Sequence, residues 1–327
     1  MPRIGIVTPA PPGSQAGNRV TAERWAELLR ALGNPVSVLT EYRDEDIEIL
    51  VALHAVKSAP SVERFAARHP GRPVVVAITG TDIHRDPSTA DYDRHHAIAR
   101  RTAAVADRIV FLREPTSEER GWLLDAPAWP KCRVIYQSAE PPLFRRQSRA
   151  GKFEVCVLGH LRAVKDPFRT AEASRLLPPE SRVRVLHVGA AFASEMEARA
   201  WQELAENLRY RWYGELPRDD ALHLLSGCRL LAMTSRSEGG PSAVSEALAC
   251  GVPVVSTRIS GVTGLLGDGY PGYFPVGGTA ELARLLWRCE TTPAFYDALK
   301  EWCDGRRHLI EPAREMESWR ALMDEFL

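Results

Sequence analysis

The chain has 327 residues, with 42 acidic and 42 basic side chains and a formal net charge of zero. This length fits two domains of ordinary size, and the balanced charge argues against a general nucleic-acid surface or a polybasic membrane surface. No apolar run approaches the length of a membrane span, so we expect no stable membrane insertion. The opening residues 4–7 indicate a short buried strand rather than a signal peptide. Six scattered cysteines without a C-x-x-C pair favour buried free thiols and a cytoplasmic protein.

The first half of the chain alternates strand-like and helix-like segments, which predicts an α/β fold with a parallel sheet. The predicted strands cover residues 4–7, 36–39, 49–53 and 74–78. A helix between the first two has an apolar face that includes Trp25 and Leu29, and it ends at Gly33. Ligands of such sheets bind beyond the carboxyl ends of the strands. We therefore expect the loops at 9–19, 54–58 and 79–85 to face one cleft.

These loops supply the candidate residues of an acceptor site. They are Gly17, Asn18, Arg19, His54, Thr79, Gly80, Thr81 and Asp82. Arg19 suits an anion near the start of the helix, although a solvated arginine fits equally well. A lone histidine at a strand end, such as His54, is more often a plain polar residue than a catalytic one. Asp82 suits either an acceptor contact or the cap of a following helix.

The second half repeats the α/β pattern after a polar linker at 145–152. Its predicted strands cover residues 153–158, 183–188, 209–213, 229–233 and 252–256, and its predicted helices cover 279–289 and 312–326. The predicted domains are therefore 1–145, joined by the C-terminal helix at 310–327, and 151–309.

The stretch from Ser237 to Glu246 has the strongest chemical signal in the chain. It reads as a tight loop that opens a short helix, with Pro241 at the first helical position and Ser242 capping an amide. Unpaired amides and the helix dipole form an anion site at such a start. Glu246 lies one turn below Ser242, where its carboxylate can accept hydrogen bonds from a diol beside a bound phosphate.

Glu238 and Glu246 form an E-x7-E motif, and flanking sequences S-x-S-E-G-x-P and E-A-L-A-x-G-x-P-V-V accompany it. This segment resembles the retaining glycosyltransferases of the GT-B fold, in particular family 4. The resemblance implies two Rossmann-like domains facing a central cleft, with a C-terminal helix that crosses back to the first domain. It also implies an enzyme whose donor is a UDP-sugar. A buried amphipathic helix with two solvated glutamates is the alternative interpretation.

The turn at 159–167 resembles the family's G-R-L-x-x-x-K-G loop, whose Arg and Lys hold the donor pyrophosphate. Lys165 occupies the Lys position, His160 replaces the Arg, and Arg162 is the nearest substitute. The resemblance implies catalytic roles for Glu238, Lys165 and Arg162, with Glu238 at the sugar ring. It implies donor binding by Glu246 at the ribose and by Gly239, Gly240, Pro241, Ser242, Ala243, His160, Gly214 and Leu216. No D-x-D pair occupies a plausible metal loop, so we expect no metal and no cofactor besides the UDP-sugar.

A narrower resemblance concerns the acceptor. The opening Ile4–Ser14, the loop Gly17–Ala22 and the segments Ala52–Ala55, Thr79–Asp82 and Gly159–Arg162 resemble the selenosugar synthase of selenoneine biosynthesis (SenB-like). That family joins a sugar from UDP-N-acetylglucosamine or UDP-glucose to selenophosphate. Three alternatives stay open: a family-4 enzyme with a hydroxyl acceptor in polysaccharide or glycolipid assembly, a sugar-nucleotide epimerase, and a catalytically silent UDP-sugar sensor. The oligomeric state stays open too.

Overall fold

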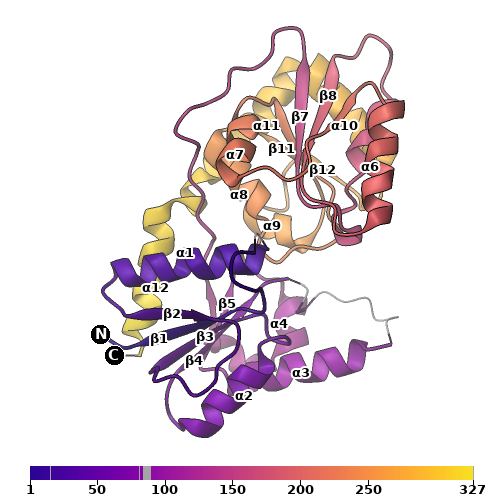
Figure 1. The fold of residues 1–327 in the computed structure, drawn as a ribbon. Helices are drawn as coiled ribbons and strands as arrows, with labels where there is room; N and C mark the ends of the chain where they lie inside the picture. The colour runs from indigo at the N-terminus through magenta and orange to yellow at the C-terminus, as the bar shows by residue number, and fades with distance from the viewer. Residues whose placement is uncertain (15, 81, 84–89, 327) are drawn as a thin grey trace. The chain divides into compact units, whose positions relative to one another are not determined.

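The computed structural model describes all residues except 15, 81, 84–89 and 327. The chain divides into two compact units. The first comprises Met1–Gln137, Glu238–Gly240 and Pro312–Leu327, and the second comprises Ser138–Ser237 and Pro241–Glu311. Each unit contains a six-stranded sheet with helices packed on it (Figure 1). All described strand pairs are parallel, as the alternating pattern predicted.

The sheet of the first unit has the strand order β2-β1-β3-β4-β5-β6. Its strands are β1 (Ile4–Val7), β2 (Val36–Leu39), β3 (Ile49–Leu53), β4 (Val74–Ile78), β5 (Arg108–Phe111) and β6 (Cys132–Val134). The first four confirm the predicted strands. The sequence analysis did not predict β5 and β6. Strands β3 and β4 are buried along their whole length, as expected of central parallel strands.

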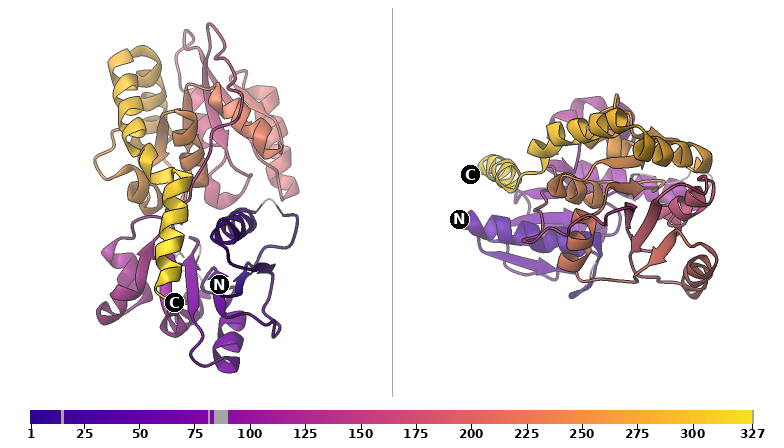
Figure 2. Two further views of the ribbon diagram at one scale, coloured as in Figure 1. Left: turned by 90° about the vertical axis from the view of Figure 1, so that its left-hand side faces the viewer. Right: turned by 90° about the horizontal axis from the view of Figure 1, so that it is seen from above.

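Helices cover both faces of this sheet. They are α1 (Gly17–Ala31), α2 (Ala59–Arg68), α3 (Tyr92–Val105), α4 (Ser117–Leu123), η1 (Ala126–Lys131) and α12 (Pro312–Asp324). The C-terminal helix α12 packs on α1 in this unit, as predicted (Figure 2). Trp319 meets Trp25 edge to face at 4.7 Å between ring centroids. Trp25 Nε1 also donates to the buried Glu315 carboxylate at 2.8 Å, so the helix is held by apolar burial and a buried hydrogen bond.

The sheet of the second unit has the strand order β12-β11-β10-β7-β8-β9. Its strands are β7 (Phe153–Leu158), β8 (Val183–Val188), β9 (Tyr210–Trp212), β10 (Leu230–Met233), β11 (Val254–Thr257) and β12 (Tyr273–Phe274). Its helices are η2 (Ala163–Lys165), α5 (Arg169–Arg175), α6 (Ser194–Glu206), α7 (Arg218–Ser226), α8 (Ser242–Cys250), α9 (Ser260–Leu266), α10 (Thr279–Thr291), α11 (Pro293–Arg306) and η3 (Arg307–Ile310). This is the strand order of the Rossmann fold.

The chain passes from the first unit to the second at Gln137–Ser138, earlier than the predicted linker. The segment 138–150 has no helix or strand, but hydrogen bonds tie it to the second unit. Ala139 N donates to Ile310 O at 3.1 Å, and Arg146 N donates to Ser226 Oγ at 3.0 Å. These non-local contacts, which composition does not reveal, group residues 138–150 with the second unit.

No described helix has the length and apolar character needed to cross a membrane. All six cysteines are free thiols, and all but the half-buried Cys132 are buried.

Candidate active site

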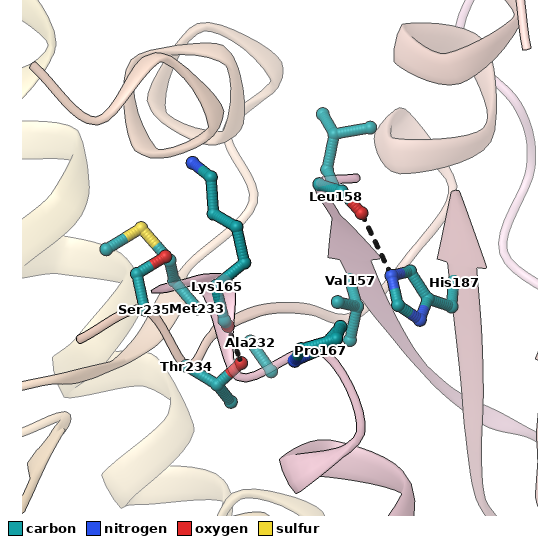
Figure 3. Close-up of a pocket in the computed structure, with 10 residues that line it drawn as sticks. Val157, Leu158, Lys165, Pro167, His187, Ala232, Met233, Thr234 and Ser235 are labelled. Atoms are coloured by element: carbon teal, nitrogen blue, oxygen red, sulfur yellow. Dashed lines mark hydrogen bonds between the residues drawn. The ribbon is translucent and has the colours of Figure 1, made fainter. Parts of the chain in front are cut away.

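The second unit has a topological switch point between β7 and β10. The chain leaves β7 toward β8 and leaves β10 toward β11, on the other side of the sheet, so the loops after β7 and β10 diverge. Ligands of open parallel sheets bind at such points. A small pocket lies there (Figure 3). It is lined by Val157, Leu158, Gly159, Lys165, Pro167, His187, Ala232, Met233, Thr234 and Ser235.

The backbone beneath Lys165 is held by the end of β10. The Thr234 hydroxyl lies 2.9 Å from the carbonyl oxygens of both Lys165 and Asp166. Arg236 N donates to Val164 O at 2.8 Å. The half-buried Lys165 therefore extends its ammonium from a braced loop rather than from a mobile one, which suits electrostatic work on a ligand.

Asp166 occupies the position where the resembled loop has glycine. It adopts a left-handed conformation, with φ 45° and ψ 55°. Asp tolerates this region better than most residues, and its carboxylate accepts from Arg169 Nε at 3.0 Å. The loop thus keeps a glycine-type turn without glycine.

His187, on strand β8, contacts the start of the same loop at Gly159. Its ring is fully buried, with Nε2 at 3.0 Å from Gly159 O and Nδ1 at 2.9 Å from the Tyr210 hydroxyl. Burial lowers the pKa of His187 to about 4, against a raising effect of the bond to Gly159. The ring is therefore neutral near pH 7 and acts as a rigid bridge between strand and loop. Sequence analysis did not single it out, because a histidine inside an apolar strand carries no motif.

His160 and Arg162, the two candidate partners of Lys165, differ in burial and in their contacts. His160 is half-buried, its Nδ1 accepts from Ala190 N at 3.0 Å, and its ring lies 4.9 Å from that of Phe192. Arg162 is exposed at the start of η2. Of the described residues, those that line the pocket include Lys165 but neither His160 nor Arg162. A role for Arg162 at a pyrophosphate stays a prediction.

Helix α8 begins at Ser242, one residue later than predicted. Pro241 is the N-cap rather than the first helical residue, and Ser242 is the first helical residue rather than the cap. The predicted cap was therefore wrong, because a cap must lie before the helix rather than inside it. Glu238, Gly239 and Gly240 form the loop before the helix and group with the first unit. Ser242 is exposed and Ala243 half-buried, as an anion site at the helix start requires.

Glu246 lies on α8 with only 16% of its side chain exposed. Its Oε1 is 3.5 Å from Nε of Arg218, the first residue of α7. Sequence analysis missed Arg218, because it belongs to no motif and its partner lies far along the chain.

The predicted base-binding loop follows β9. Gly214 has a left-handed φ of 68°, and its carbonyl accepts from Gly189 N at 2.8 Å. Leu216 is half-buried in the same loop. Leu161 N in turn donates to Ala190 O at 2.8 Å. Backbone hydrogen bonds thus join the loops after β7, β8 and β9 into one surface at the carboxyl edge of the sheet.

The first unit has its own switch point, between β1 and β3. Gly17, Asn18 and Arg19 open α1 beside it. The Arg19 side chain is only 10% exposed, and its Nε donates to Glu23 at 2.7 Å. The structure therefore gives Nε of Arg19 a partner within its own helix, while its Nη1 is buried without a hydrogen-bond partner. A role of Arg19 as an anion ligand stays a prediction.

Asp82 organises the neighbouring loops. Its fully buried carboxylate accepts from the amides of Ala55 at 3.2 Å, Thr79 at 3.0 Å and Gly80 at 2.6 Å. Neither an acceptor contact nor a helix cap describes this role, because backbone amides from two loops converge on the carboxylate. Thr79 is half-buried and Gly80 is buried with φ 122°. Thr81, a further predicted acceptor residue, lies outside the described residues.

His54 directly follows β3 and has a left-handed conformation, with φ 75°. It is buried, and its Nδ1 accepts from Val56 N at 3.3 Å and Lys57 N at 3.2 Å. Burial lowers the pKa of His54, against a raising effect of Asp82. His95 Nε2 lies 3.1 Å from Asp82 O. Both rings are thus tied to backbone groups of this loop cluster.

In the part of the chain that the structure describes, no group of three or more His, Cys, Asp or Glu side chains is arranged to hold a metal ion. The expectation of a metal-independent site remains a prediction.

Residues 142–301 match the family profile described as "Glycosyl transferases group 1". This match falls almost entirely within the second unit. Among curated proteins, the chain is 25% identical over 130 residues to the O-antigen chain mannosyltransferase B of Escherichia coli, covering 39% of this chain and 34% of that protein. It is 30% identical over 123 residues to the D-inositol 3-phosphate glycosyltransferase of Corynebacterium urealyticum, covering 35% and 29%. The chain thus spans about a third of the length of these relatives.

Solved structures extend the likeness to the whole fold. HepE from Anabaena, in complex with UDP and glucose, has a TM-score of 0.76 at 17% identity, over 99% of this chain and 100% of that one. Sucrose-phosphate synthase from Thermosynechococcus elongatus has a TM-score of 0.79 at 15% identity, over 99% and 98%. These values establish the GT-B fold with two Rossmann-like domains. None of these matches is described as a selenosugar synthase.

Proposed function

We propose that the protein is a glycosyltransferase that moves a sugar from UDP-N-acetylglucosamine or UDP-glucose to selenophosphate. The proposal of a UDP-sugar donor rests on the pocket at the switch point of the second unit. There Lys165, whose loop is held by Thr234, lies beside the end of β10. The next helix after β10, α8, carries Glu246. The neighbour HepE, whose structures contain UDP and glucose or UDP-glucose, supports the same donor class.

The proposed donor contacts follow from charge. The Lys165 ammonium and the amides at the start of α8 would bind the diphosphate, and the Glu246 carboxylate would accept from the ribose hydroxyls. Arg162 and His160 would add donors near the diphosphate, and Glu238 would contact the sugar ring. We further propose that these cationic and amide groups, rather than a metal ion, stabilise the departing charge.

The chemical step is a substitution at the anomeric carbon. Selenium forms a bond to the anomeric carbon. The bond between that carbon and the diphosphate oxygen breaks at the same time, and its electron pair leaves with UDP. Selenium in selenophosphate is anionic, so the step needs orientation of the nucleophile more than removal of a proton.

The loop cluster of the first unit is consistent with such an acceptor. The described histidines there, His54 and His95, are tied to backbone groups. A hydroxyl acceptor would gain from a positioned base. A group 1 enzyme with a hydroxyl acceptor is the second candidate, favoured by the names of both curated relatives.

The test is UDP release from UDP-N-acetylglucosamine, with and without selenophosphate, followed by mass analysis of the product. We expect selenophosphate-dependent release and a sugar that contains selenium. Turnover with a lipid or sugar alcohol but not with selenophosphate would favour the second candidate. Conversion of the donor without any acceptor would indicate an epimerase, and binding without turnover would indicate a UDP-sugar sensor.

Glu246→Ala tests the donor contact separately. Loss of hydrogen bonds to a carboxylate should weaken UDP-sugar binding roughly 10- to 100-fold and leave very slow turnover. Titration calorimetry with the folded variant measures this, and an unchanged affinity would remove the ribose contact from the proposal.

A further inference from the structure

The ion pair between Arg218 and Glu246 joins two helices that are separate in sequence. Arg218 is the first residue of α7, and Glu246 lies within α8. Arg218 Nε is 3.5 Å from Glu246 Oε1, with 47% of the arginine and 16% of the glutamate side chain exposed. We propose that Arg218 is a positioning residue that orients the Glu246 carboxylate toward the ribose diol of the donor. This inference rests on the proposed function.

The surroundings of Arg218 support this role. Pro217, the N-cap of α7, comes directly after the loop that contains Gly214 and Leu216. Gly214 O accepts from Gly189 N, so the loop is fixed to the one after β8. One guanidinium therefore links a braced loop at the carboxyl edge of the sheet to a carboxylate on the neighbouring helix.

The burial of Glu246 separates this pair from ordinary surface ion pairs. A carboxylate that is largely removed from water needs a partner, and it loses rotational freedom when it has one. By contrast, the pair Arg284–Glu281 lies within one helix, with 72% and 42% of the side chains exposed. Such an exposed pair orients little, because solvent competes for both groups. Arg284 is thus the matched control.

The experiment compares two ligands that differ only in the diol. Calorimetry measures binding of UDP and of 2′,3′-dideoxy-UDP to the wild type, Arg218→Ala, Arg218→Lys and Arg284→Ala. In the wild type, UDP should bind more tightly than the dideoxy compound. Arg218→Ala should weaken UDP binding roughly tenfold and leave the dideoxy compound unchanged, because only the diol uses the oriented carboxylate. Arg218→Lys should keep part of the preference, and Arg284→Ala should keep all of it.

A second comparison uses Glu246→Ala. Removing Arg218 in that background should have no further effect on UDP binding, because the two residues act through one contact.

Three results would overturn the inference. Equal weakening of both ligands would mean that Arg218 acts on another part of the donor, and no weakening would mean a surface ion pair. Additive effects of the Arg218 and Glu246 substitutions would show independent roles. If the wild type binds UDP but the diol preference survives in Arg218→Ala, only this inference fails. If the wild type binds no UDP, the proposed function fails with it.

Discussion

The two switch points of this molecule use their charged residues in opposite ways. In the second unit, backbone groups, the Thr234 hydroxyl and the neutral His187 brace the loop, and Lys165 lies in the pocket wall. In the first unit, the charged groups themselves form the brace: Asp82 binds three backbone amides and Arg19 pairs with Glu23. The edge of the second unit thus has an ammonium group in its pocket wall, whereas the edge of the first unit uses its Asp82 carboxylate to hold its own loops together.

Lys165→Ala is the strongest test of this contrast. We expect a roughly 10²- to 10³-fold loss in kcat for UDP release, because the substitution removes a fixed cation from the leaving group. The free energy of unfolding, measured by thermal unfolding, should change by less than about 1 kcal/mol. The reason is that backbone groups and the Thr234 hydroxyl hold this loop, and the substitution leaves them in place. Lys152→Ala, at an exposed lysine before β7, is the control. An equal loss of activity in that variant would show only a general effect of charge.

Asp82→Ala should have the reverse profile. It leaves three amides without their acceptor, so the free energy of unfolding should fall by about 3 kcal/mol. Chemical denaturation measures this loss. Asp125→Ala removes an 83% exposed carboxylate that pairs with Arg100, and it should cost less than about 1 kcal/mol. Similar losses in both variants would contradict the architectural role of Asp82.

The His187 bridge gives a pH dependence to the brace of the second unit. Its pKa is about 4 in the folded protein and about 6.5 when unfolded. Between these values the unfolded chain binds more protons, so stability declines as the pH falls from about 6.5 to about 4, by about 3 kcal/mol. His187→Gln keeps a donor and an acceptor without titrating, so this part of the decline should disappear. Urea unfolding of both proteins at several pH values tests this. Parallel curves of unfolding free energy against pH for the wild type and His187→Gln would refute it.

Asp166→Gly should have the smallest effect. The change relieves about 1 kcal/mol of left-handed strain but removes the pair with Arg169, which is worth a similar amount. The free energy of unfolding should stay within about 1 kcal/mol of the wild type. Asp166→Ala keeps the strain and loses the pair, so it should be the less stable of the two. The opposite order would mean that the turn does not require a glycine-type conformation.

Sequence analysis located the elements well where local pattern decides them. Strands such as β3 and β4 are apolar runs between turn residues, and they occur at the predicted residues. The same analysis predicted that Asp82 and His54 lie at the carboxyl edge of the first sheet, after β4 and β3, as they do in the structure. It left their roles open, because which amides reach Asp82 depends on two loops that are distant along the chain.

Local chemistry thus determined the succession of strands and helices and the position of the charged loop around Lys165, since each depends on neighbours within one turn or strand. The order of the strands, and hence the switch point between β7 and β10, arose only in the folded sheet. The pair of Arg218 with Glu246 and the bridge of His187 to Gly159 arose there too. These features join residues far apart in sequence, so they depend on how whole elements pack rather than on any local pattern.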